Sequence, residues 1–144
     1  PHAWTPWMKG CLIAADEIVI VATPDLASLR NAKNIIELVK TARPNDTPPR
    51  LVINQVGMPK RPEIPSKDFA ETMGLDPSAI IAFEPHLFGQ AANNGQMVIE
   101  LAPKAPVSEA LRRLCRAITG RTMQGAANRN AASIFSFFKG KKQA

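Results

Sequence analysis

EIVIVAT at residues 17–23 and RLVINQV at residues 50–56 are two short, apolar stretches rich in β-branched side chains. Neither shows the regular polar alternation of a strand that has one face in water. Runs of this kind are typical of strands that are buried on both faces, as in a parallel sheet covered by helices. The two stretches therefore predict an α/β fold, with a partial parallel sheet flanked by helices.

The sequence between these stretches predicts the helix that connects two parallel strands. Pro24 ends the first strand, and Asp25 is the expected N-cap of a helix over residues 26–42. Apolar side chains recur there at intervals of three and four residues, at Leu29, Ala32, Ile36 and Val39. A loop with three prolines follows at residues 43–49. Strand, helix and strand in this order predict a right-handed crossover.

Further elements are expected on both sides of this unit. In chain order they are a helix over residues 4–14, a short helix capped by Ser66 and ended by Gly74, a strand over residues 79–83, a helical turn over residues 87–93, and a helix from Pro106 or Val107 to Ile118 with Leu111, Leu114, Cys115 and Ile118 facing inward.

The basic residues are concentrated toward the end of the chain. Of the 144 residues, which carry a net charge of +6, residues 1–109 hold ten basic and twelve acidic side chains, while residues 110–144 hold eight basic and none acidic. We divide the chain into a globular part at 1–119, a linker at 120–132 and an aromatic-basic tail at 133–144.

Composition argues against several classes of protein. No apolar run approaches the roughly 20 residues that span a bilayer, and no signal peptide opens the chain. Cys11 and Cys115 have no CxxC partner, which favours a reduced, cytoplasmic protein. No cluster of Cys, His and carboxylates has metal-ligand spacing. Because Pro1 is not a natural start, we expect a fragment or a processed product.

Two segments lie where ligand-binding residues are often found. Asn54 ends the second strand, and Glu84, Pro85 and His86 follow the third. In open α/β sheets, ligands bind at the carboxyl ends of the strands. The sequence has no GxxxxGK[ST], HExxH or GxSxG motif. From position alone, a ligand contact and a simple strand-end turn are equally good interpretations.

Five motifs, taken in order, resemble the second half of the ParA/MinD family of P-loop ATPases. They are ADEIVIVATPD at residues 15–25, SLRNA at 28–32, LVINQ at 51–55, FEP at 83–85 and ANNG at 92–95. The resemblance covers about residues 11–118. Within the family, residues 1–39 and 89–100 are most similar to the CpaE/TadZ branch, the pilus-assembly ATPases of the Tad (Flp) system.

This resemblance implies that the chain is the C-terminal half of a P-loop domain. It implies that Asn54 contacts the adenine of ATP and that Glu84, Pro85 and His86 form a loop beside the base. The phosphate-binding loop and the Mg-associated Asp would lie upstream, so these residues alone should not hydrolyse ATP. Two positions depart from the family pattern, with Gln55 in place of a common Arg and Asn31 in place of a frequent Asp.

The resemblance also implies a biological role for the parent protein. Members of this branch are spatial regulators that place the Tad pilus machinery, so the expected partners are pilus-assembly proteins and a second copy of the chain. The expected location is the cytoplasm, at the inner membrane surface or the cell pole. Alternatives are a non-hydrolysing scaffold of the same fold and a DNA-partitioning ATPase, although nucleic acid is not an expected partner.

Two groups of side chains near the C-terminus remain open to more than one interpretation. Arg112, Arg113 and Arg116 form either a solvated helix face or a DNA-binding patch. The tail combines aromatic and basic residues, namely Ile134, Phe135, Phe137, Phe138, Lys139, Lys141 and Lys142. This combination is typical of an interfacial membrane anchor, or of a segment that docks on protein.

Overall fold

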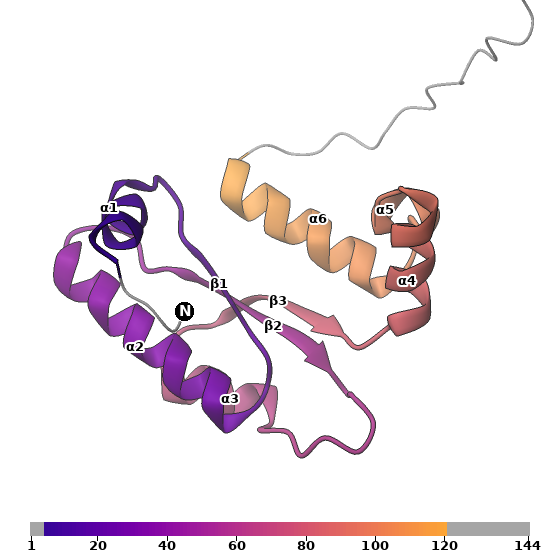
Figure 1. Cartoon of the computed structure of the whole chain (residues 1–144), viewed down its shortest axis with the longest axis horizontal. Helices are drawn as coiled ribbons and strands as arrows, with labels where there is room; N and C mark the ends of the chain where they lie inside the picture. The colour runs from indigo at the N-terminus through magenta and orange to yellow at the C-terminus, as the bar shows by residue number, and fades with distance from the viewer. Residues whose placement is uncertain (1–4, 121–144) are drawn as a thin grey trace, which may run out of the picture.

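A three-stranded parallel sheet forms the centre of the protein (Figure 1). The computed structural model describes residues 5–120. The strands are β1 (Val19–Ala22), β2 (Arg50–Val56) and β3 (Pro77–Ala82), and they lie side by side in chain order. Both neighbouring pairs are parallel. The expected α/β fold, with a partial parallel sheet between helices, is confirmed.

The helices lie on both faces of this sheet. They are α1 (Pro6–Ala14), α2 (Leu26–Ala42), α3 (Ser66–Met73), α4 (Pro85–Asn94), α5 (Val98–Leu101) and α6 (Pro106–Thr119). The bounds of α2 and β2 match the predicted ranges. The cap expected at Ser66 is wrong, because Pro65 holds the N-cap position of α3 without a side-chain hydrogen bond. The short helix α5 was not expected from the sequence.

One face of the sheet packs against α2 and α3. The buried side chains of this layer are Ile20, Ala22, Ala32, Ile36, Leu51, Ile53, Phe69 and Met73. Those of α2 follow the predicted helical stripe, and Asp25 caps the helix through a 2.8 Å bond from the N–H of Ser28 to its carboxylate. The N-cap predicted at Asp25 is therefore confirmed.

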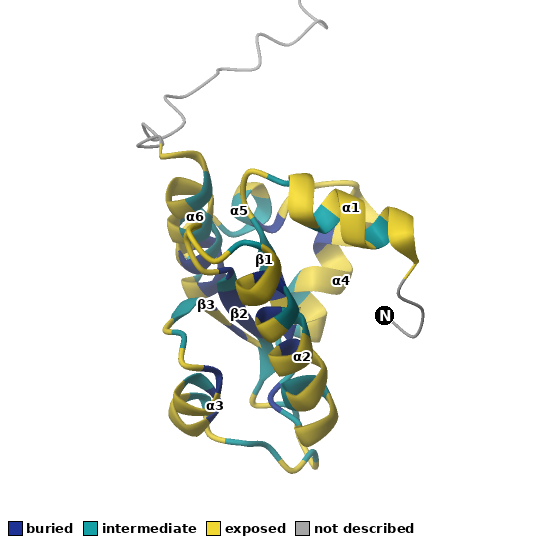
Figure 2. Ribbon diagram, turned by 90° about the vertical axis from the view of Figure 1, so that its left-hand side faces the viewer, coloured by how far each residue is buried: buried dark blue, intermediate teal, exposed yellow. Residues whose placement is uncertain are grey.

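The other face packs against α4, α5 and α6. Its buried side chains are Val52, Ala79, Ile81, Ala91, Val98, Val107 and Ala110, with Leu111 and Leu114 against them. Cys115 is exposed, so its predicted inward position is wrong. It follows Leu114 by one residue, about 100° around the helix, which places it outside the stripe that contacts β3. Figure 2 shows the buried residues gathered in the strands and the helix faces beside them.

The expectation that β1 is buried on both faces is also wrong. Val21 is 61% exposed, although Val52 beside it in the register is 1% exposed. Helix α6 packs mainly over β3, so on this face of β1 Val19 is partly covered while Val21 stays exposed. The outer edge of β1 has no partner strand among residues 5–120. An apolar side chain beside a free strand edge favours self-association.

Helix α1 is held mainly by polar contacts. None of its residues is buried within the described part of the chain. Arg43, just after α2, donates from its guanidinium to the carbonyl of Ala15 at 2.5 Å and pairs with Asp46 through its Nε. Because the carbonyls at the end of a helix lack intrahelical donors, Arg43 fixes the end of α1 beside the end of α2.

We predict that Val52→Asp unfolds the 144-residue chain, whereas Val21→Asp leaves it folded. The two positions face each other across neighbouring strands, but only Val52 would place an unpaired carboxylate in the core. That burial costs several kcal/mol, similar to the total stability of many small domains. Circular dichroism melts of both variants measure the difference. A cooperative melt of Val52→Asp near the unmodified midpoint would show that this layer is not core.

Candidate functional site

A cavity of about 320 Å³ lies at the carboxyl ends of β2 and β3. It is lined by Asn54, Gln55, Ala82, Phe83, Glu84, Pro85 and Phe88. Most of this lining is apolar, with the amides of Asn54 and Gln55 on one side and the aromatic rings on another. Small-molecule sites commonly combine apolar walls with a few polar groups that fix orientation.

The strand β2 is irregular where it meets this cavity. Ile53 pairs with Ile80 and Val56 pairs with Ala82, so Asn54 and Gln55 together lie opposite the single residue Ile81. This is a β-bulge, a feature that is over-represented beside active sites because it redirects side chains. Gln55 adopts a left-handed φ of 59°. Its N–H donates to Asn54 Oδ1 at 2.9 Å, which fixes the orientation of the Asn54 amide.

The loop after β2 folds back on the bulge through Arg61 and Glu63. Arg61 donates to the carbonyl of Gln55 and, at 2.8 Å, to the carboxylate of Glu63. Glu63 also accepts the N–H groups of Gly57 and Met58, at 2.9 and 3.0 Å. These contacts hold the pKa of Glu63 below its ordinary value. The hydrogen bond from the Gly57 N–H has the largest effect, and the hydrogen bond from the Arg61 side chain has the next largest. The loop is therefore tied at several points to the end of the strand.

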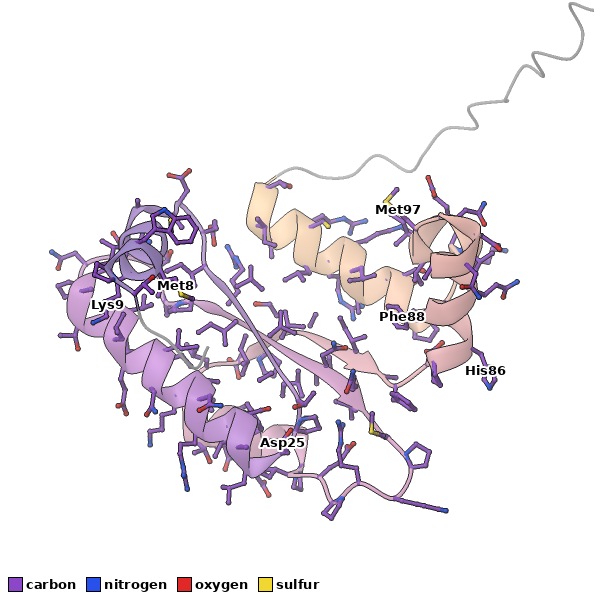
Figure 3. All side chains as sticks on the ribbon, viewed as in Figure 1. Met8, Lys9, Asp25, His86, Phe88 and Met97 are labelled. Carbon is purple, nitrogen blue, oxygen red and sulfur yellow. The ribbon has the colours of Figure 1, made fainter. Side chains whose placement is uncertain are left out.

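A second polar cluster lies at the carboxyl end of β1. The Asp25 carboxylate accepts from the hydroxyl of Thr23, from the Ser28 N–H and, at 3.1 Å, from the Ser28 hydroxyl. These hydrogen bonds lower the pKa of Asp25. The bond from the Thr23 hydroxyl has the largest effect, and the bond from the Ser28 N–H has the next largest. Figure 3 shows Asp25 at the start of α2. The cluster explains why Thr23, Pro24 and Asp25 end the strand and begin the helix.

The structure brings together three of the four residues that the sequence singled out for base binding. Asn54, Glu84 and Pro85 line the cavity. His86 does not line it, and its side chain projects from α4 away from the sheet (Figure 3). Pro85 and His86 form the first turn of α4 rather than a loop. The fixed φ of proline suits the first position of a helix, which explains the early start. The roles of all four remain predictions.

Sequence reasoning missed part of the lining. Phe83, Phe88 and Gln55 reach the cavity from the end of β3, from α4 and from the bulge. Phe88 could have been predicted from the sequence. It follows Pro85 by three residues and Glu84 by four, and residues at this spacing lie on the same side of a helix. The place of Gln55 in the cavity wall could not be predicted in this way, because the sequence of a strand does not show where a bulge will form.

A larger hollow of about 540 Å³ lies between α3 and the start of β3. Its lining includes the exposed pair Lys67 and Glu71, together with Pro77 at the amino end of the strand. This is the end of a parallel sheet opposite to the one where ligands bind. We therefore place the functional site at the smaller cavity. Among residues 5–120, no group of three or more His, Cys, Asp or Glu side chains could hold a metal ion.

The parallel sheet, the helices on both faces and the cavity at the carboxyl edge define an open α/β domain, a class in which ligands commonly bind at the carboxyl ends of the strands. No protein-family model matches the sequence. The chain is 30% identical over 118 residues to the septum site-determining protein MinD of Bacillus subtilis, which covers 80% of this chain and 43% of that protein. Over the aligned region the chain is homologous to proteins of the MinD/ParA family of P-loop ATPases.

Solved structures agree with this assignment. The chain superposes on MinD of Pyrococcus horikoshii, solved with Mg-ADP, with a TM-score of 0.67 over 83% of this chain and 47% of that one, at 16% identity. A ParA family ATPase from Chlorobium tepidum gives a TM-score of 0.55 at 26% identity, over 76% and 43%. The chain thus spans less than half the length of each of these relatives. In the described residues, no helix is both long and apolar enough to cross a membrane.

We predict that Asp25→Ala lowers the free energy of unfolding by about 1 kcal/mol, the usual effect of losing an N-cap. Asp25→Asn should keep the cap but remove its titration. Because folding lowers the pKa of Asp25, its ionic contribution is complete above its unfolded pKa and is lost as the pH falls through the folded pKa.

Urea unfolding of the three proteins at pH 7 and in the acid range measures this difference. The Asp25→Asn variant should lose less stability on acidification than the unmodified chain. Equal losses in both proteins would show that the Asp25 carboxylate does not contribute to the acid sensitivity.

Proposed function

We propose that this chain supplies the base-binding half of a MinD/ParA-like ATPase. The observation that supports this most directly is the cavity at the carboxyl ends of β2 and β3, where Asn54 lies beside Phe83, Pro85 and Phe88. A mainly apolar cavity with the amide of Asn54 in its wall suits a purine base. The homology supports the same assignment, since a MinD relative has been solved with Mg-ADP.

The fixed amide of Asn54 suits adenine in particular. Its Oδ1 accepts the Gln55 N–H and has a second lone pair, whereas its Nδ2 has no hydrogen-bond partner among residues 5–120. An adenine edge presents the N7 acceptor beside the N6 amino donor, a pattern that an Asn amide reads with both atoms. Guanine presents two acceptors at the same edge, so its O6 would face the Asn54 oxygen unfavourably.

We do not assign the phosphates and Mg to residues of this chain. The sequence has no Walker A motif, and the described residues offer no cluster for a metal ion. Backbone N–H groups and a lysine make most of a phosphate cradle. The free edge of β1 and the exposed Val21 are consistent with a sheet that continues into the phosphate-binding half. We propose that ATP and Mg bind only when this half is joined to its phosphate-binding half.

We further propose that the parent protein is a spatial regulator of Tad (Flp) pilus assembly, acting as a dimer with other pilus-assembly proteins near the cell pole. The support is the similarity of residues 1–39 and 89–100 to the CpaE/TadZ branch. A non-hydrolysing scaffold with the same partners is the second candidate, favoured by Gln55 and Asn31 at positions where the family usually has Arg and Asp. A DNA-partitioning role is a third, resting on the arginines of α6.

We predict that Asn54→Ala, in the protein at its natural length, weakens ATP binding by about 1–2 kcal/mol, or roughly tenfold in Kd. The variant loses the amide that would contact the base. Asn34→Ala on the exposed side of α2 is the matched control and should bind normally. Titration with ATP by calorimetry makes the measurement. Equal affinities in the two variants would rule out the proposed base contact.

The aromatic-basic tail supports a proposal of peripheral membrane binding. Its residues, including Phe137, Phe138 and Lys139, lie outside the described residues, so the proposal rests on their sequence. Burial of several large apolar side chains contributes several kcal/mol, and each lysine near an anionic surface adds about 1 kcal/mol. Two tails in a dimer would bind together more strongly than one.

We predict that the dimer co-sediments with anionic vesicles and that removal of residues 133–144 abolishes this binding. Added salt should also weaken it, because it screens the lysines. Phe137→Ser combined with Phe138→Ser should reduce vesicle binding without changing the thermal midpoint. If the double variant instead lowers the midpoint and binds vesicles normally, the tail docks on protein.

A further inference from the structure

We propose that Arg61 is a positioning residue of the candidate base site, and that it sets the selectivity for adenine over guanine by holding the bulge at Asn54 and Gln55. The residue does not line the cavity. It acts through the backbone of Gln55, which in turn holds the Asn54 amide. This inference rests on the proposed function, since it concerns the selectivity of the same site.

The first observation is the unusual backbone of Gln55. Gln55 has a left-handed φ of 59°, a conformation that is unfavourable for a residue with a side chain and that glycine adopts readily. Such a conformation persists where the surrounding structure enforces it, and it is concentrated at functional sites. Gln55 lies in a bulge at the rim of the cavity, where an ordinary strand would continue without strain.

The second observation is the way in which Arg61 enforces this conformation. Its Nη2 donates to the carbonyl of Gln55, and its Nη1 lies 3.4 Å from the side-chain oxygen of the same residue. One guanidinium therefore holds both the main chain and the side chain of Gln55. The planar fork of an arginine is suited to this, because several donors are fixed in one plane.

The third observation is that Arg61 is itself held in place. Its side chain is 19% exposed and is paired with Glu63 at 2.8 Å. Glu63 is anchored by the N–H groups of Gly57 and Met58. The Nε of Arg61 is buried and has no partner among the described residues. An unpaired buried donor is destabilising, so stability alone does not explain why this guanidinium is packed against the bulge.

These contacts form a chain from Arg61 to the base-reading amide. Arg61 holds the Gln55 carbonyl, and the Gln55 N–H donates to Asn54 Oδ1 at 2.9 Å. These two groups are separated by the φ and ψ angles of Gln55, so the left-handed φ sets the direction of the N–H relative to the carbonyl. If Gln55 relaxed to an ordinary strand conformation, that N–H would turn away and the amide of Asn54 would rotate freely. A freely rotating amide can meet either purine, because it can present its NH₂ group to an acceptor. Fixed orientation is thus what separates adenine from guanine.

Arg50 provides a matched comparison at the opposite end of the same strand. It makes a two-point ion pair with Glu17, at 3.0 and 3.1 Å, and its side chain is 28% exposed. It thus resembles Arg61 in residue type, in burial and in its carboxylate partner. It lies at the amino end of β2, away from the cavity, so its loss should not reach the Asn54 amide.

The experiment measures Kd for ATP and for GTP in the protein at its natural length, by calorimetric titration. Arg61→Ala should lower the preference for ATP over GTP by about fivefold to tenfold, the effect of one misdirected hydrogen bond. Arg50→Ala should leave this preference unchanged. Arg61→Lys keeps the charge but loses the planar fork, so its preference for ATP over GTP should lie between those of Arg61→Ala and the unmodified protein. If Arg61→Ala does not fold, the comparison is made with Arg61→Lys alone.

The outcomes separate this inference from the proposed function. If Asn54→Ala weakens ATP binding but neither Arg61 variant changes the ATP to GTP ratio, the site is a base site and the role of Arg61 is wrong. If the Arg61 variants weaken both nucleotides equally, with a lower thermal midpoint as for Arg50→Ala, Arg61 is a structural tie only. If Asn54→Ala has no effect on ATP binding, the base site itself fails.

Discussion

The burial of β2 on both of its faces is the constraint on which the rest of the structure depends. Within residues 5–120, β2 is the strand with a neighbour on each edge, and helices pack above and below it. Leu51 and Ile53 contribute to one layer of the core, and Val52 contributes to the other. Because every backbone group of a buried strand must be paired, β1 and β3 are held in register along it. The helices then cover the apolar faces that remain.

The site lies where this burial stops. At Asn54 and Gln55 the strand leaves the core, and a bulge gives the chain room to present polar groups at the carboxyl edge. The buried part of the strand is held by its neighbours on both edges. The end of the strand is held by the following loop, where Arg61 donates to the carbonyl of Gln55 and to Glu63. Burial fixes the position of the strand, and the bulge sets the direction of the side chains of Asn54 and Gln55. Together they explain how an apolar sheet can present polar side chains to the cavity at its edge.

Two exposed features of the structure lie on β1. Val21 is exposed because α6 packs mainly over β3, and the outer edge of β1 is open because no strand among residues 5–120 pairs with it. The homologous proteins are about twice as long as this chain. The same geometry makes the isolated chain a candidate for self-association, since an open parallel edge accepts another strand.

The sequence by itself determined the fold class, the ranges of α2 and β2 and the cap at Asp25, whereas Asn54, expected after the strand, lies inside β2 at the bulge. These features depend on local patterns, since apolar periodicity and capping residues act over a few neighbouring positions. The bulge, the left-handed Gln55, the contact of Arg61 with the Gln55 carbonyl, the place of Phe88 in the cavity wall, and the exposure of Val21 and Cys115 were decided by tertiary structure alone. Each depends on which elements meet in space: a bulge forms only against the register of a partner strand, and exposure depends on where a later helix packs.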